Sequence, residues 1–150
     1  MSSQAWEQIS VVKISQMILD SYEHWLGKSL CSREGSPEKQ AKRLFLSPFV
    51  VTCHGNEAEP IFCYGNQKAL ELFETEWDSF VKMPSRQSAE AMHRTERAEM
   101  LKRALLQGFI DNYQGIRISS KGIRFRIENG TIWNVQDFGQ AATFAHWQII

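Results

Sequence analysis

The strongest constraint on the fold is the alternation of apolar and polar residues in the last third of the chain. Three apolar residues from Ile123 to Ile127 alternate with two arginines, and this two-residue period is that of a strand with one buried face. Asn129-Gly130 follows directly. This pair is typical of two-residue hairpins, because a type I′ turn needs positive φ at both central positions. We therefore predict a hairpin turn here, followed by two further strands within residues 131–149.

A turn at this position fixes which side chains share a face of the sheet. One face is then predicted to hold Ile123, Phe125, Ile127, Ile132, Asn134, Gln136 and Phe138. The other face is predicted to hold Arg124, Arg126, Glu128, Trp133, Val135 and Asp137. The apolar first face is the expected core side, so its two amides either point into a ligand cavity or satisfy backbone groups. The Trp133 face is expected to be covered by the N-terminal helix or by a second subunit.

The first two thirds of the chain predict helices around a short pair of strands. We expect helices over about 3–30, 37–46, 67–73 and 89–107, and strands over 49–54 and 61–64. Ser36-Pro37 and Asn66 mark two helix starts. This order predicts one α+β domain over residues 1–150, with helices over one face of a sheet. Residues 3–47 form its N-terminal helical cap, which begins with an amphipathic helix, and 48–150 its core.

Composition narrows the classes of partner. Seventeen basic and seventeen acidic side chains give no net charge, whereas phosphate contacts need a concentrated positive field, so we expect no nucleic acid as partner. The chain has no apolar run of the roughly 18 residues that a membrane span requires, so we expect a soluble protein without a membrane partner. Three cysteines without a C-x-x-C motif, and the lack of a secretory leader, predict reduced thiols and a cytoplasmic location.

Motifs for chemistry are missing from the sequence. There is no Gly-x-Ser-x-Gly element and no cysteine–histidine arrangement of a known catalytic type. His93 and Glu96 stand one helical turn apart, but a metal site needs three or four convergent ligands and no second pair is visible. We therefore expect no catalytic residues, no enzymatic activity and no metal site.

Several stretches together resemble a known family. They are 64–75 (Tyr-Gly-Asn-Gln-Lys-Ala-Leu-Glu-Leu-Phe-Glu-Thr), 84–94, 108–119 and 133–147 with Trp133 and Trp147. The chain resembles the MEKHLA domain, a PAS-related module known from bacteria and from plant homeodomain–zipper regulators, over nearly its whole length. The resemblance implies a PAS-like five-stranded antiparallel sheet with helices over one face. It implies no catalytic activity and, because no homeodomain or zipper accompanies the domain here, no DNA binding.

PAS-like domains commonly sense small ligands or pair with protein partners, and both functions stay open. In the first, the domain binds an unknown small molecule and signals through a separate protein. The residues predicted to bind the ligand are Arg86, His93, Arg94, Phe125, Asn134 and Gln136. The alternative for the two arginines is internal pairing with Glu90 and Glu96, and His93 could instead ligate a haem. The identity of any cofactor stays open.

In the second function, the domain has a solid core and no ligand, and it dimerises or docks on a protein. The residues predicted to form the partner surface are Ile14, Ile18, Trp25 and Trp133.

Overall fold

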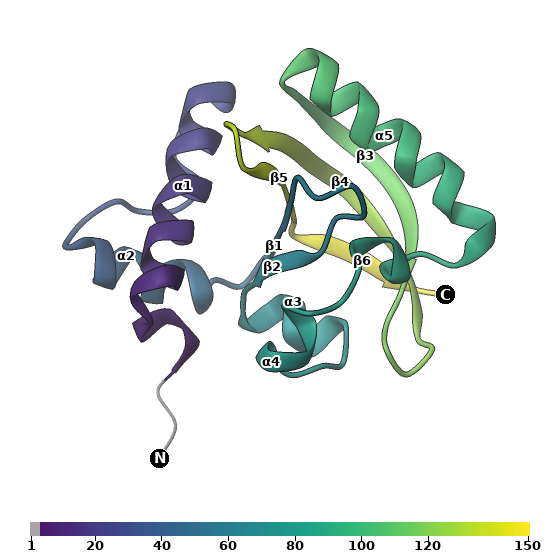
Figure 1. Ribbon diagram of the computed structural model, residues 1–150, viewed down its shortest axis with the longest axis horizontal. Coiled ribbons are helices and arrows are strands. Elements are labelled where there is room, and N and C mark those ends of the chain that lie inside the picture. The colour runs from purple at the N-terminus through teal and green to yellow at the C-terminus, as the bar shows by residue number, and fades with distance from the viewer. Residues whose placement is uncertain (1–3) are drawn as a thin grey trace.

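The computed structural model describes residues 4–150, in which six antiparallel strands form one sheet between two groups of helices (Figure 1). The strands are β1 (Val50–Gly55), β2 (Phe62–Gly65), β3 (Phe109–Ile118), β4 (Arg124–Val135), β5 (Gly139–Phe144) and β6 (His146–Ile149). Their order is β2-β1-β5-β4-β3, and β6 pairs with the first half of β4 while β5 pairs with its second half. The α+β fold with an antiparallel sheet is confirmed. The sixth strand continues the line of the fifth after a break at Ala145.

The helices lie on both sides of this sheet. They are α1 (Ile9–Leu26), α2 (Pro37–Phe45), α3 (Gln67–Leu72), α4 (Trp77–Phe80) and α5 (Arg94–Gln107), with short 3₁₀ turns η1 (Ala5–Glu7), η2 (Ser85–Ser88) and η3 (Ala91–His93). Figure 1 shows α1 and α2 on one side of the sheet and α5 on the other. The helix predicted to begin at Ser3 has its first residue outside the described part of the chain, and it ends early, at Gly27, which has φ of 73°.

Helix starts follow the predicted capping residues. Ser36 Oγ accepts a hydrogen bond from Lys39 N at 3.3 Å, with Pro37 at the first helical position. Asn66 is completely buried. Its Oδ1 accepts from Ala69 N at 3.1 Å and from Val51 N at 3.0 Å. One side chain therefore starts α3 and fixes that helix to β1, an inner strand of the sheet.

The hairpin predicted at Asn129-Gly130 is wrong, because β4 runs straight through both residues. Asn129 does have a positive φ, of 52°. There it produces a β-bulge: Gly130 pairs with Tyr113, and the next pair joins Ile127 to Gly115, so β4 has one residue more than β3 in this interval. At Gly130 a Cβ atom would lie 2.2 Å from Tyr113 Cε1. Both residues of the pair are thus needed inside a strand, where they mimic the signature of a turn.

The bulge also explains why Ile127 and Ile132 lie on one face of β4 and Trp133 on the other, as predicted, whereas Ile123, which was predicted in the core, is 42% exposed. The extra residue shifts the alternation once between Ile127 and Ile132, so both side chains lie on the same side of the sheet and line the same cavity. Trp133 lies on the opposite side, where its Nε1 donates to Ser21 Oγ of α1 at 2.9 Å.

Helix α1 covers the Trp133 side of the sheet, as the sequence predicts. The Tyr22 ring meets the Trp133 ring edge-on with centroids 5.0 Å apart, and Trp25 Nε1 donates to the Asn134 carbonyl at 2.9 Å. Ile18 and Trp133 are both 0% exposed. This helix is therefore part of the core.

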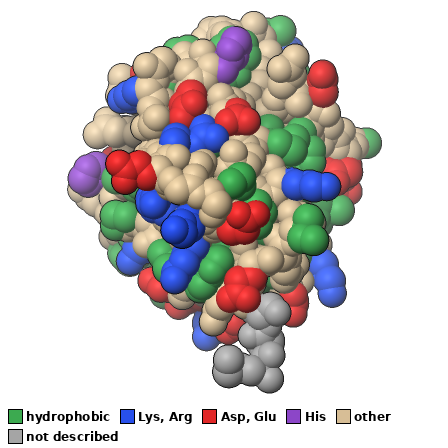
Figure 2. All heavy atoms as spheres, turned by 90° about the vertical axis from the view of Figure 1, so that its left-hand side faces the viewer, with side chains coloured by type: hydrophobic (Ala, Val, Ile, Leu, Met, Phe, Trp, Pro, Cys, Tyr) green, Lys and Arg blue, Asp and Glu red, His purple; other side chains and the backbone are tan. Residues whose placement is uncertain are grey.

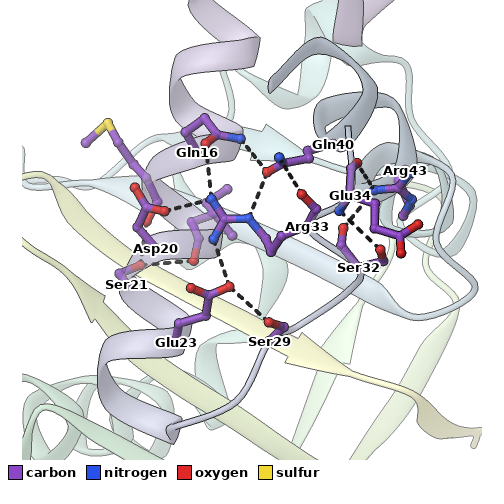
Figure 3. A network of polar contacts seen from close by, with 12 residues as sticks. Gln16, Asp20, Ser21, Glu23, Ser29, Ser32, Arg33, Glu34, Gln40 and Arg43 are labelled. Atoms are coloured by element: carbon purple, nitrogen blue, oxygen red, sulfur yellow. Dashed lines mark hydrogen bonds and ion pairs between the residues drawn. The ribbon is translucent and has the colours of Figure 1, made fainter. Parts of the chain in front are cut away.

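Arg33 ties the loop after α1 to both cap helices (Figure 3). Its guanidinium forms ion pairs with Asp20 and Glu23 of α1, each at 2.8 Å, and its Nε donates to Gln40 Oε1 of α2 at 2.7 Å. Because several neighbouring charges share one planar guanidinium, this network has a more defined geometry than an isolated surface pair.

Candidate functional site: a charged cavity inside the domain

A cavity of about 50 Å³ lies between the sheet and the helical segments opposite α1. Its apolar wall is formed by Phe62, Phe73, Leu101, Ile127, Ile132, Ala141, Ala142 and Phe144. Its polar lining consists of Thr52, His54, Ser88, Arg97, Tyr113, Arg117 and Gln140. Every strand from β1 to β5 contributes to this lining, together with η2 and α5.

Arg117 is a buried cation in the cavity wall. It is 5% exposed, and its Nη1 donates to the Ile116 carbonyl at 2.8 Å and lies 3.4 Å from Glu96 Oε2. The guanidinium passes over Gly115, where a Cβ atom would lie 2.8 Å from Arg117 Nη1. Glycine at 115 therefore leaves room for this arginine to lie along its own strand.

Arg97 brings a second cation from α5 to the same cavity. It is half-buried and forms no hydrogen bond or ion pair with any residue in the described range 4–150. Burial, together with the charge of Arg117, lowers the pKa of Arg97 to about 10. The side chain is still protonated at neutral pH, so two positive charges face one cavity.

His54 presents an acceptor to the cavity. Its Nδ1 lies 3.1 Å from the Gly55 carbonyl, and since a carbonyl can only accept, Nδ1 carries the proton of the neutral ring. Burial lowers the pKa of His54 below its ordinary value, with a further lowering from Arg97. The neutral ring therefore has a bare lone pair at Nε2, which is buried without a partner among the described residues.

Gln140 is oriented by its amide hydrogens. Its Nε2 donates to the Leu101 carbonyl at 2.8 Å and to Asn134 Oδ1 at 3.2 Å. Asn134 Nδ2 in turn donates to the Ala104 carbonyl at 3.2 Å near the end of α5. These amides fix α5 to the sheet and leave Gln140 Oε1 as a second acceptor beside the cavity.

The six residues predicted to bind a ligand lie outside this lining. Arg86 pairs with Glu59 on the surface, Arg94 Nε donates to the Ala89 carbonyl at 3.0 Å, and His93 ends the short turn before α5. The expected pairing of the two arginines with Glu90 and Glu96 is also wrong, because those carboxylates pair with Arg124 and Arg117 instead.

The three predicted sheet residues are near the cavity without lining it. Phe125 is completely buried, and its ring packs against the cavity residues Phe73 and Phe144, with centroids 5.3 and 6.5 Å away. Asn134 and Gln136 line a separate open groove of about 730 Å³ between α1 and the β4–β5 turn.

Arg117 was not predicted as a site residue, because the alternation of residues in β3 does not reveal which face of the sheet its side chain lies on. Alternation alone would place Ile116 and Ile118 in the core if the loop between β3 and β4 had an even length. The loop has three residues between the bonded pair Ser119 and Ile123, so Arg117 pairs with Phe125 and shares its inward face. No sequence signal marked His54 or Arg97, whose local patterns are those of an ordinary strand and an exposed helix.

The predicted partner surface is also not an exposed patch. Ile18 and Trp133 lie in the core, and Ile14 and Trp25 are half-buried. On the face that carries α1 and α2, acidic and basic side chains alternate with hydrophobic ones (Figure 2). All four residues therefore pack in or against the core.

Two further features are absent from residues 4–150. No helix there is both long and apolar enough to cross a membrane. No group of three or more histidine, cysteine, aspartate or glutamate side chains is arranged to hold a metal ion within that range.

Comparison with known proteins gives one family and one fold. The MEKHLA domain family model matches residues 12–149. The homeobox-leucine zipper protein REVOLUTA of Arabidopsis thaliana is 25% identical over 126 residues, which are 83% of this chain but only 15% of that protein.

Solved structures extend the likeness in fold. A PAS domain from Colwellia psychrerythraea superposes with a TM-score of 0.61 and 13% identity over 75% of this chain and 95% of that one. The LOV domain of a blue-light-activated histidine kinase from Erythrobacter litoralis superposes with a TM-score of 0.54 and 14% identity. That match covers 69% of this chain and 97% of the LOV domain chain. At these identities the likeness shows the PAS-like fold.

Proposed function

Since the chain belongs to the MEKHLA domain family and has a PAS-like fold, we propose that it is a non-enzymatic sensory module that binds a small molecule in its interior cavity. The observation that carries this proposal is that two polar groups of the cavity lining lack a hydrogen-bond or ion-pair partner among the described residues. His54 Nε2 is buried without a partner, and Arg97 has none within residues 4–150.

Such groups are costly unless something completes them. A buried polar atom without a hydrogen bond, such as His54 Nε2, destabilises a protein by about 1–3 kcal/mol. Two arginines in one cavity add repulsion between like charges. A bound molecule that pairs with these groups offsets the cost, which is why polar atoms facing a cavity indicate binding more strongly than the cavity alone.

The route from ligand to output runs through α5. This helix contributes Arg97 and Leu101 to the cavity, while only Ala104 of the helix is fully buried. Few buried contacts make α5 one of the less stable elements of the fold. Ligand binding would therefore change how α5 rests on the sheet, and a separate signalling protein would detect that change.

A thermal-shift screen of molecules with about three to five non-hydrogen atoms, the size that a cavity of about 50 Å³ admits, tests the proposal. The blocking variant is Ala142→Val, because Ala142 lines the cavity and valine suits a strand. The matched control is Ala145→Val, at an exposed position just after β5. Compounds that raise the melting temperature of wild type and the control, but not of Ala142→Val, support the proposal. Failure of all neutral, anionic and cationic compounds to do so overturns it.

A further inference from the structure

We propose that the ligand is a small hydroxycarboxylate, bound through its carboxylate by Arg97 and Arg117 and through its hydroxyl by His54. This inference rests on the proposed function and specifies the chemistry of the same cavity. It is argued from the charge, hydrogen-bonding pattern and size of the cavity.

The charge of the cavity favours an anion. Arg97 and Arg117 contribute two permanent cations that donate and never accept hydrogen bonds. The opposing charge is Glu96, which is 39% exposed and lies 3.4 Å from Arg117. Glu96 is therefore at the solvent side; its charge raises the pKa of Arg97, but it forms no ion pair with Arg97 among the described residues. A carboxylate between the guanidinium groups would accept charge-assisted hydrogen bonds from both and reduce their repulsion.

The acceptors in the cavity require a donor on the same ligand. Neutral His54 offers a lone pair at Nε2, and Gln140 uses its amide hydrogens on Leu101 and Asn134, leaving Oε1 as an acceptor. A plain carboxylate would satisfy the arginines and leave His54 unpaired. A plain alcohol would do the reverse. A molecule with a carboxylate and a hydroxyl satisfies both kinds of group.

Size and lining limit the carbon skeleton. The cavity holds about 50 Å³, and each water-sized position needs about 10–15 Å³ of such volume, so the space suits a molecule of roughly three to five non-hydrogen atoms. The side chains of Phe62, Ile127 and Ile132 supply apolar wall. Such a wall favours a ligand with carbon atoms over a fully polar oxyanion of the same size, such as phosphate.

Isothermal titration calorimetry with matched probes tests this chemistry on the full chain. The probes are glycolate, with glycolamide lacking the charge, acetate lacking the hydroxyl, and inorganic phosphate lacking carbon. Glycolate should bind about ten-fold or more tightly than glycolamide, because a charge-assisted pair is lost in glycolamide, and several-fold more tightly than acetate. Glycolamide or phosphate binding as tightly as glycolate would overturn the inference.

Variants locate the contacts. Arg97→Gln and Arg117→Gln should each weaken glycolate binding about ten-fold or more, whereas Arg103→Gln, on the exposed side of α5, should not. His54→Leu should abolish the preference for glycolate over acetate while acetate still binds. Circular dichroism checks that each variant is folded. If the buried Arg117 variant unfolds, the half-buried Arg97 variant still decides, and unchanged glycolate affinity in it contradicts the assignment.

The outcomes of the thermal-shift screen and the titration distinguish a wrong ligand class from a wrong proposed function. If a neutral or cationic compound is excluded by Ala142→Val while hydroxycarboxylates do not bind, the cavity is a ligand site and this inference is wrong. If nothing binds in the cavity, both the inference and the proposed function are wrong.

Discussion

Arg97 shows at the residue scale how this cavity departs from a structural core. Its charge is half-buried, lies close to Arg117 and has no hydrogen-bond or ion-pair partner in the range 4–150, and its pKa falls from its ordinary value to about 10. A folded-state pKa below that of the unfolded chain means that the charged form weakens the fold at neutral pH. A residue that costs stability where it stands is typical of functional sites.

Removing this charge should therefore stabilise the protein. Arg97→Met is expected to raise the free energy of unfolding at pH 7 by about 1–2 kcal/mol, which is less than the full pKa shift implies because part of the side chain is exposed. Urea denaturation measures the change, with Arg103→Met as the control for loss of one positive charge on α5. A loss of stability in Arg97→Met larger than in the control would contradict a repulsive role for Arg97.

His54 should make the protein less stable as the pH decreases below about 6.5. Burial lowers its pKa below the ordinary 6.5, with Arg97 lowering it further while the Gly55 carbonyl and Glu57 raise it. Between the folded-state value and about 6.5 the unfolded chain binds more protons, so stability falls as pH decreases through this window. Denaturation curves of wild type and His54→Gln should diverge in slope there and run parallel above pH 7. Parallel curves throughout would mean that His54 is not held neutral.

At the scale of elements, the sequence predicted what depends on local chemistry and missed what depends on pairing. The caps Ser36 and Asn66 are where propensity places them, because each accepts its capping hydrogen bond from a residue three positions on. The strands β1 and β2 also lie where propensity places them, and they pair with each other across a short turn. Asn129-Gly130 misled because hairpin turns and bulges both need positive φ. The inward position of Arg117 follows from an odd-length loop, and no alternation pattern reveals the length of a loop.

Substitutions at Gly130 and Gly122 distinguish the cost of a steric clash from the cost of backbone strain. Gly130→Ala should lower the free energy of unfolding by about 2–4 kcal/mol, because its Cβ would lie 2.2 Å from Tyr113 Cε1 in the core. Gly122→Ala is the matched control: Gly122 has φ of 89° with no atom near its Cβ, so strain alone should cost about 1 kcal/mol. Equal losses in the two variants would contradict the packing of Tyr113 across β4.

Helix α1 should behave as core. Ile18→Asp is expected to lower the free energy of unfolding by more than about 3 kcal/mol, because it buries an unpaired charge at a position that is 0% exposed. Ile9→Asp, in the same helix but 76% exposed, should change stability by less than about 0.5 kcal/mol. Thermal or urea unfolding compares them. A well-folded Ile18→Asp that only dissociates an oligomer would restore the partner surface predicted from the sequence.

The whole molecule combines a family fold with a cavity that is incompletely satisfied from within. Residues 12–149 fit the MEKHLA domain, and the sheet with its helical cover is that of PAS domains. The resemblance could be stated from the sequence because it rests on motifs spread along the chain. The cavity could not, because His54, Arg97 and Arg117 come from β1, α5 and β3 and meet only once the sheet is formed.

Native mass spectrometry of the protein as purified from cells tests the central claim, that the cavity binds a small molecule, most directly. We predict an excess mass on the folded 17.3 kDa chain that disappears on denaturation. The same excess should be present in Ala145→Val and absent in Ala142→Val. A bare chain mass in wild type, unchanged after incubation with a cell extract of small metabolites, would contradict a ligand-binding cavity and leave the domain with a solid structural core.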